Sequence, residues 1–290
     1  MRAALIVLAL ALTGCGAPRH ATTVPVSPKK AAASPLGLVV GAVGPLEVSS
    51  VPGATFEHRP TLATMPAYPL VIVPAWTTAL ATVVAAAKRH PESHYAYLGG
   101  TTAGAHRPNL VGLVLRDEQA ARLGGFVAGL VAGEQGGSSP RVAWVGPEER
   151  RLADAFVRGV HEAAPDVTIL RAWSRSTPSS CKEAALAATG RGAVAVMARD
   201  GLCAEAAVDG AHQQNVVGLR ISDFELRSVP VGVVVRDAVN GAYPGGEDLV
   251  FGATSGAIAV RRLDRRISGE AAIRARAAAQ QLANGLRLSG

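Results

Sequence analysis

Short apolar runs rich in β-branched residues alternate with helix-like segments along most of this 290-residue chain. The alternation is most regular in the second half of the chain. Strands are expected there at 141–146, 167–173, 192–198 and 216–220, and helices at 148–165, 180–189 and 202–213. Such runs are typical of strands that are buried on both faces of a parallel sheet. The alternation therefore predicts an α/β fold built from doubly wound parallel sheets.

The rest of the chain follows the same rule less regularly. Strands are expected at 37–43, 70–73, 95–98, 110–115, 229–235, 248–253 and 256–263, and helices at 77–89, 117–133 and 269–286. The predicted division is a first lobe at 36–135 and about 222–263, a second lobe at 136–221, and a C-terminal helix within 264–290. Two such lobes place a ligand-binding cleft at the carboxyl ends of their strands.

The first fifteen residues carry the features of an export signal. Arg2 precedes the apolar run 3–12, and residues 12–15 read Leu-Thr-Gly-Cys. The run is too short to cross roughly 30 Å of hydrocarbon as a permanent helix, so we expect a removable signal peptide at 1–14. The leucine three residues before Cys15 resembles the lipobox of bacterial lipoproteins. This resemblance implies a lipid on Cys15 and a location on the extracytoplasmic face of the cell membrane, and an ordinary secretory signal with a chance cysteine is the alternative.

The segment after the expected cleavage site has the composition of a linker. Residues 15–35 are rich in proline, serine, threonine, alanine and lysine and show no apolar period. This composition predicts a flexible tether between the lipid and the folded lobes. No later segment has a long enough apolar run to predict a membrane span, so we expect the lobes to be soluble.

The chain is basic, with 29 Lys and Arg against 22 Asp and Glu and a formal net charge of +7. A basic chain can bind nucleic acid, but the arginines are scattered over helix faces and no basic run is interleaved with aromatic residues. A basic surface that faces an anionic cell envelope explains the charge more simply. We therefore expect no nucleic-acid partner.

Two cysteines remain once Cys15 carries a lipid. Cys181 begins an expected helix, and Cys203 begins the next one after the strand 192–198. Helix N-termini and strand C-termini share one edge of a parallel sheet, and thiols in an oxidising compartment usually pair. The sequence therefore predicts a Cys181–Cys203 disulfide, which would stabilise the fold by roughly 3 kcal/mol on the chain-entropy account.

Enzyme and metal signatures are scarce. The sequence contains no Gly-x-Ser-x-Gly, no Walker loop and no His-Glu-x-x-His. Pro91 would break a helix that placed His90 and His94 on one face, and the glycine-rich stretch 99–104 does not open an expected helix, so it is weak as a phosphate site. We expect a binding protein without catalytic activity, metal or cofactor.

Four stretches together resemble one known family. They are residues 116–120 with 125–129, the strand 141–146 with 156–159 and Pro165, the segment 215–223, and residues 252–260 after Pro244. In order and spacing they are similar to the basic membrane protein family, whose members are lipoproteins with a type 1 periplasmic-binding-like fold that serve ABC importers. The resemblance covers about residues 70–263.

The resemblance implies a ligand site between the lobes. Characterised members of the family bind purine nucleosides or similar small molecules, with an aromatic face on the base and acidic groups on the ribose hydroxyls. Trp76, Asp223 and Arg236 fall near family positions that contact ligand. Asp200 lies in a loop that faces the same cleft.

One departure from the family concerns the first lobe. The family opens with a strand and an Asp-x-Ser-Phe-Asn segment that contacts ligand, and residues 39–64 contain no such motif. They are also too few for the usual helix, strand and helix before the strand at 70–73. We therefore expect an abbreviated first lobe.

These observations leave three hypotheses about function. The leading one is a lipid-anchored solute-binding protein of an ABC importer, which captures a nucleoside-like or other small polar ligand by hinge closure and works with a permease. The rival is a degenerate relative that acts as a sensor or interaction module in the envelope without transport. An envelope hydrolase has only the α/β fold in its favour.

Overall fold

The computed structural model describes residues 37–44, 46 and 51–288, and all statements about structure concern these residues. The expected signal peptide 1–14, the lipidated Cys15 and the tether 15–35 lie outside them. Among the described residues, no helix combines the length and the hydropathy that a membrane span requires.

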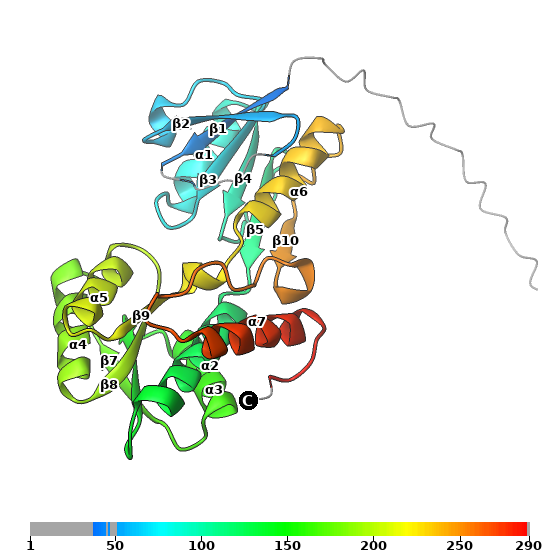
Figure 1. The fold of residues 1–290 in the computed structure, drawn as a ribbon. Coiled ribbons are helices and arrows are strands. Elements are labelled where there is room, and N and C mark those ends of the chain that lie inside the picture. The colour runs from blue at the N-terminus through cyan, green and yellow to red at the C-terminus, as the bar shows by residue number, and fades with distance from the viewer. Residues whose placement is uncertain (1–36, 45, 47–50, 289–290) are drawn as a thin grey trace, which may run out of the picture. The chain divides into compact units, whose positions relative to one another are not determined.

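Six of the described strands form the first parallel sheet, in the order β10-β5-β4-β3-β1-β2 (Figure 1). They are β1 (Leu38–Val43), β2 (Ala54–Arg59), β3 (Leu70–Pro74), β4 (His94–Leu98), β5 (Leu110–Leu115) and β10 (Asp248–Phe251). Every pair in this sheet is parallel. The sequence predicts all of these strands except β2.

The connection from β1 to β2 is unusually short. Parallel strands are normally joined by a crossover of a dozen or more residues, most often a helix, whereas here only residues 44–53 intervene. Their described part contains no helix, and the connection from β2 to β3 contains only the 3-10 helix η1 (Leu62–Thr64). Among the described residues, β2 therefore has no α-helix in the connection before it or in the one after it.

Two helices cover the two faces of the first sheet. Helix α1 (Leu80–Arg89) packs Val83 and its neighbours against one face. Helix α6 (Ser228–Val239) packs Val231, Val234 and Val235 against the other face, beside residues of β1, β3, β4 and β5. Helix α6 therefore buries strands that lie more than a hundred residues earlier in the sequence.

The valine-rich run 229–235, predicted as a strand, belongs to helix α6 instead. Valine has a low helix propensity and a high strand propensity, which favours the strand interpretation locally. The buried positions Val231, Val234 and Val235, however, repeat with helical spacing. Tertiary packing on the first sheet therefore decides the conformation here.

The second parallel sheet has the strand order β7-β6-β8-β9. Its strands are β6 (Arg141–Gly146), β7 (Thr168–Trp173), β8 (Ala193–Ala198) and β9 (Val217–Arg220), each within a residue or two of its expected position. Helices α3 (Arg150–Ala163), α4 (Pro178–Gly190) and α5 (Leu202–Gln213) connect them. The expected α/β architecture with two parallel sheets is confirmed.

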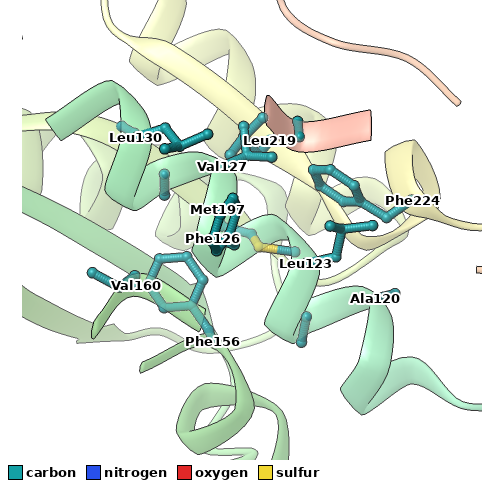
Figure 2. Close-up of a cluster of buried hydrophobic side chains, with 14 of the residues drawn as sticks. Ala120, Leu123, Phe126, Val127, Leu130, Phe156, Val160, Met197, Leu219 and Phe224 are labelled. Atoms are coloured by element: carbon teal, nitrogen blue, oxygen red, sulfur yellow. The ribbon is translucent and has the colours of Figure 1, made fainter. Parts of the chain in front are cut away.

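The largest core lies on one face of the second sheet. Figure 2 shows side chains of helix α2 (Asp117–Gln135), α3, β8 and β9 packed together, including Phe126, Phe156 and Met197. The C-terminal helix α7 (Gly269–Ala283) joins the same core through Ala271, Ala275 and their neighbours.

This core changes the expected lobe boundaries. Residues 117–135, assigned to the first lobe from the sequence, pack in the second-lobe core, and the C-terminal helix packs there as well. Helix α2 is apolar over most of its surface, with twelve buried residues between Ala120 and Ala132. Helix α2 lies between β5 of the first sheet and β6 of the second sheet. Its position in the chain therefore does not reveal which of the two sheets it covers.

The expected strand at 256–263 is not part of either sheet. It is a crossing segment in which Ile258 forms a single antiparallel bridge with Glu225. Backbone hydrogen bonds from Leu226 to the carbonyl of Ala257 (2.7 Å) and from Ala259 to the carbonyl of Phe224 (3.0 Å) join it to residues 221–227. The two segments that connect the lobes after β9 and β10 therefore support each other.

Cys181 of α4 and Cys203 of α5 form the disulfide that the sequence predicts, with sulfurs 2.05 Å apart. It fastens the first turns of the two helices on the side of the second sheet where its strands end. Both cysteines are buried in an alanine-rich core between α4, α5 and the sheet.

Glycines allow α2 and α3 to cross at close range. A Cβ on Gly125 would lie 2.1 Å from the carbonyl oxygen of Phe156, and one on Gly159 would lie 1.9 Å from that of Arg122. Backbone atoms cannot yield as a flexible side chain can, so a larger residue must separate the helices. The glycines of the family-like stretches 125–129 and 156–159 thus have a packing role.

We predict that Gly125→Ala lowers the free energy of unfolding by about 2 kcal/mol, because it overpacks this crossing. Gly133→Ala is the matched control on the same helix. Gly133 is exposed and has open space around its missing Cβ, so this change should raise stability by up to about 1 kcal/mol through helix propensity. Denaturant unfolding measures both, and equal effects of the two substitutions would contradict the close crossing.

Candidate functional site

A cavity of about 620 Å³ lies between the two sheets, and we call it the interlobe cavity. Residues from both lobes line it: Ala75, Trp76, Gly99, Leu115, Asp117, Pro147, Glu149, Ser176, Arg199, Asp200, Gly201, Leu202, Cys203, Ile221, Glu225 and Arg227. Most of them directly follow the carboxyl end of a parallel strand, namely β3, β4, β5, β6, β7, β8 or β9. This is the usual ligand position in parallel α/β sheets.

Trp76 is the aromatic residue of the cavity and follows β3. Its ring packs beside Gly99, where a Cβ would come within 3.2 Å of the indole Cζ3. The guanidinium carbon of Arg227 lies 4.1 Å from the centre of the ring, in a cation–π contact. Trp76 is still 39% exposed, so part of the indole is open to the cavity.

Arg227 also contacts two carboxylates. Its Nη2 donates to an oxygen of Asp200, and its Nε and Nη2 lie 3.1 Å and 3.0 Å from Oε2 of Glu225. The second oxygen of Asp200 accepts the backbone amide of Ser222 at 2.9 Å. Arg227 therefore connects Trp76 of the first lobe with Asp200 of the second lobe.

A second ion pair lies on the second-lobe side of the cavity. Arg199 contacts Glu149, and both are more exposed than the Arg227 pair. Asp117, the first residue of α2, completes the charged lining. Among the described residues, no hydrogen bond or ion pair reaches the carboxylate of Asp117.

Burial makes two of these carboxyl groups hard to ionise. For Glu225, burial and the neighbouring charges of Asp200 and Asp117 raise the pKa to about 8, against the lowering effect of Arg227. For Asp117, burial is again the largest cause and raises the pKa to about 6. The cavity thus has more buried acid groups than its two arginines neutralise.

Of the four ligand-binding candidates from the sequence, the structure brings Trp76 and Asp200 together in the interlobe cavity and places two elsewhere. Asp223 lies in the 3-10 helix η2 (Ile221–Phe224), where its Oδ2 accepts the backbone amide of Arg220 at 2.8 Å. Because this turn folds back on the end of β9, the carboxylate points away from the cavity and lines a separate one of about 360 Å³.

Arg236 is the other candidate that lies outside the cavity. It sits on α6, on a largely apolar surface with Val51, Pro52 and Val229. Since the run 229–235 is a helix on the outer face of the first sheet and not a strand ending at the cleft, its side chain does not reach the cavity.

Several residues of the cavity were not recognised from the sequence as site residues. Asp117, Glu149 and Arg199 each closely follow a parallel strand, and that position is a signal that the sequence offers. Glu225 and Arg227 lie in a crossing segment without a regular pattern. Only its antiparallel pairing with residues 257–259 places them in the cavity.

The histidines do not form a metal centre in the described part of the chain, which contains no group of three or more potential His, Cys, Asp or Glu ligands. His90 follows the last residue of α1, and His94 begins β4. The ring of His94 stacks on that of Tyr243 with 4.1 Å between centroids. His94 therefore belongs to the packing around the first sheet, whereas His90 is partly exposed and its Nδ1 lies 3.3 Å from Oε1 of Glu92.

No family model matches this chain, and no curated protein sequence matches it. Solved structures do match. An ABC transporter solute-binding protein from Conexibacter woesei superposes with a TM-score of 0.62 at 18% identity, over 87% of this chain and 98% of that chain. One from Aeropyrum pernix superposes with a TM-score of 0.58 at 15% identity, over 86% of this chain and 92% of that one.

A third similar structure, described as a transcriptional activator of the comK gene from Bacillus halodurans, has a TM-score of 0.59 at 12% identity. The match covers 85% of this chain and 98% of that chain. These likenesses confirm the expected periplasmic-binding-protein-like fold. At such low identity they establish the fold alone.

We predict that Glu225 makes the fold less stable as the pH rises. The folded protein holds a proton on Glu225 up to about pH 8, whereas the unfolded chain releases it near the ordinary value of 4.5. The free energy of unfolding should therefore fall by at least about 1 kcal/mol between about pH 5 and about pH 8. Urea unfolding across this range should show a smaller fall for Glu225→Gln.

Asp117→Asn tests the second group in a different range. Its raised pKa of about 6 means that this change should flatten the profile mainly below about pH 6. A Glu225→Gln profile that keeps the full slope of the unaltered protein between about pH 6 and about pH 8 would show that Glu225 is ionised in the fold.

Proposed function

We propose that this protein is an extracytoplasmic solute-binding protein of an ABC importer, which binds a small polar ligand in the interlobe cavity. The observation that carries the proposal is the cavity itself. It combines an aromatic ring from the first lobe with charged side chains from the second lobe and the crossing segment, in a volume of about 620 Å³ at the carboxyl ends of two parallel sheets. Cavities of this size, with a few convergent polar groups, are typical of small-molecule sites.

The connection between the lobes suits capture by hinge closure. Trp76 belongs to the first lobe and Asp200 to the second, and Arg227 lies on a segment that crosses between them. A ligand that contacts all three would stabilise the closed arrangement over an open one. The fold is shared with structures described as ABC transporter solute-binding proteins, which supports the same proposal.

We further propose that the protein is anchored by lipid on Cys15, on the extracytoplasmic face of the cell membrane. The support is the Leu-Thr-Gly-Cys stretch after a short apolar run and the tether-like composition of 15–35. Two paired cysteines in the folded part fit an oxidising compartment. A binding protein held there by lipid would deliver its ligand to a permease in the same membrane.

Membership of the basic membrane protein family and a nucleoside-like ligand are the finer parts of the proposal. The family-like stretches support the first, and the exposed part of the Trp76 ring, on which a base could stack, supports the second. Gly125 and Gly159 lie in these stretches and allow α2 and α3 to cross closely. The resemblance at these positions therefore concerns the helix crossing and gives no support for a particular ligand.

A sensor or interaction module without transport is the second candidate. The short β1–β2 connection favours it, because that connection replaces the helix and ligand-contacting segment of the family. The cation–π contact of Arg227 with Trp76 favours it as well, since the protein itself occupies one part of the aromatic surface. Neither candidate requires catalysis. Uptake of the bound solute by cells, and its loss when the gene is deleted, would distinguish transport from sensing.

We predict that Trp76→Ala weakens binding of the best ligand at least about tenfold, because it removes the aromatic contact in the cavity. The full chain, purified in detergent, would be titrated calorimetrically with nucleosides, nucleobases, sugars, amino acids and organic cations. Trp173→Ala is the matched control. Trp173 is 38% exposed, against 39% for Trp76, but it does not line the cavity.

The control variant should bind like the unaltered protein. A folded protein that binds none of these solutes would overturn the proposed function. A ligand whose affinity falls equally in both tryptophan variants would place the binding site outside the interlobe cavity.

We predict that Cys15→Ser releases the protein from the membrane fraction, because the thiol that would carry the lipid is absent. A radiolabelled fatty acid should label the unaltered chain and not the variant. Cys181→Ser together with Cys203→Ser is the control, and it should leave the label in place. Label on the Cys15→Ser variant would contradict the proposed anchor.

A further inference from the structure

The charged groups of the interlobe cavity do not balance. Four carboxylates line it, from Asp117, Glu149, Asp200 and Glu225, against two arginines. Arg227 is shared between Asp200 and Glu225, and Arg199 contacts Glu149. Even with a proton on Glu225, the three other carboxylates outnumber the two arginines, so the charge left over is negative.

Asp117 is the carboxylate that these pairs leave without a partner among the described residues. It begins α2 at the carboxyl end of β5, on the border between the two lobes. Glu118, the next residue, contacts Arg151 instead and does not line the cavity. A cation bound beside Asp117 would therefore meet a carboxylate that is free to receive it.

The contact between Arg227 and Trp76 shows which chemical group this part of the cavity accommodates. A planar guanidinium lies over the indole and has carboxylates around its edge. Trp76 is partly exposed, and Leu115 and Ile221 add apolar lining. A ligand with a cationic head and a short hydrocarbon stem would place the head on the exposed part of the indole and near a carboxylate, as Arg227 does, and the stem on the apolar lining.

We propose that the interlobe cavity binds a small organic cation, whose guanidinium or ammonium group contacts Trp76 and the carboxylate of Asp117. This inference rests on the proposed function and narrows its ligand class. An anionic ligand is disfavoured, because it would add to the negative surplus and would have to take Arg199 or Arg227 from carboxylates that already hold them.

The protonation of the cavity supports this ligand class. The raised pKa values of Asp117 and Glu225 follow from burial without enough positive charge nearby. The charged groups that act on them are Arg199, Asp200, Glu118 and Arg227. A bound cation would favour the ionised forms, so its binding should release protons near neutral pH and should strengthen as the pH rises from about 6 to about 8.

The test is a calorimetric titration of the full chain with two molecules of nearly the same shape, butylguanidinium and butylurea. The first is a cation and the second is neutral. We expect butylguanidinium to bind at least about tenfold more tightly, with a heat that depends on the ionisation enthalpy of the buffer because protons are released. Butyrate and adenosine provide the anionic and nucleoside comparisons and should bind more weakly.

Two variants of neighbouring residues locate the cation. Asp117→Asn should weaken butylguanidinium binding about tenfold or more, whereas Glu118→Gln, one residue away and outside the cavity, removes a more distant charge and should weaken it less than about threefold. If Asp117→Asn fails to fold, the comparison of butylguanidinium with butylurea on the unaltered chain still decides the ligand class.

Three results would overturn the inference. If butylurea, butyrate or adenosine binds as tightly as butylguanidinium, the cation class is wrong while a solute-binding function stands. If no cation, nucleoside, sugar or amino acid binds, the solute-binding function fails together with the inference. Equal losses in Asp117→Asn and Glu118→Gln would show that the cation does not bind beside Asp117.

Discussion

Arg227 is the residue on which the arrangement of the interlobe cavity depends. It lies over Trp76 from the loop after β3 and contacts Asp200 from the loop after β8, so that its charge is shared between the two lobes. Glu225, which is only 2% exposed, takes its hydrogen bonds from the same guanidinium. Removal of one partner from such a buried group leaves uncompensated charge, which is strongly destabilising. The pairing of residues 224–226 with 257–259 fixes the backbone that carries this side chain.

Helix α2 ties this cavity to the main core of the second lobe. Its first residue, Asp117, faces the cavity, and the next four turns pack against α3, β8 and β9 at a distance that Gly125 and Gly159 permit. A displacement at the N-terminus of α2 would therefore move a well-packed helix and not a flexible loop. In the first lobe, α1 covers one face of the sheet and α6, from the C-terminal part of the chain, covers the other.

The sequence predicts the fold where local pattern and tertiary environment agree. Strand β6 and the start of α2 lie where the apolar runs place them, because a buried parallel strand and an apolar helix are readable from a few neighbouring residues. The same reasoning fails at 229–235, where valines prefer a strand and the sheet surface selects a helix. It also fails for Asp223 and Arg236, since a side chain near a strand end can still turn away from the cleft.

The amino-acid sequence by itself determined the two parallel sheets and the pairing of Cys181 with Cys203, since these follow from apolar period, cysteine number and strand position. Only the tertiary structure decided that α2 belongs to the second lobe and that Glu225 and Arg227 enter the cavity. Both depend on contacts between residues far apart in the chain. The negative surplus of the cavity is likewise a property of that assembly, because its carboxylates are spread over more than a hundred residues of sequence.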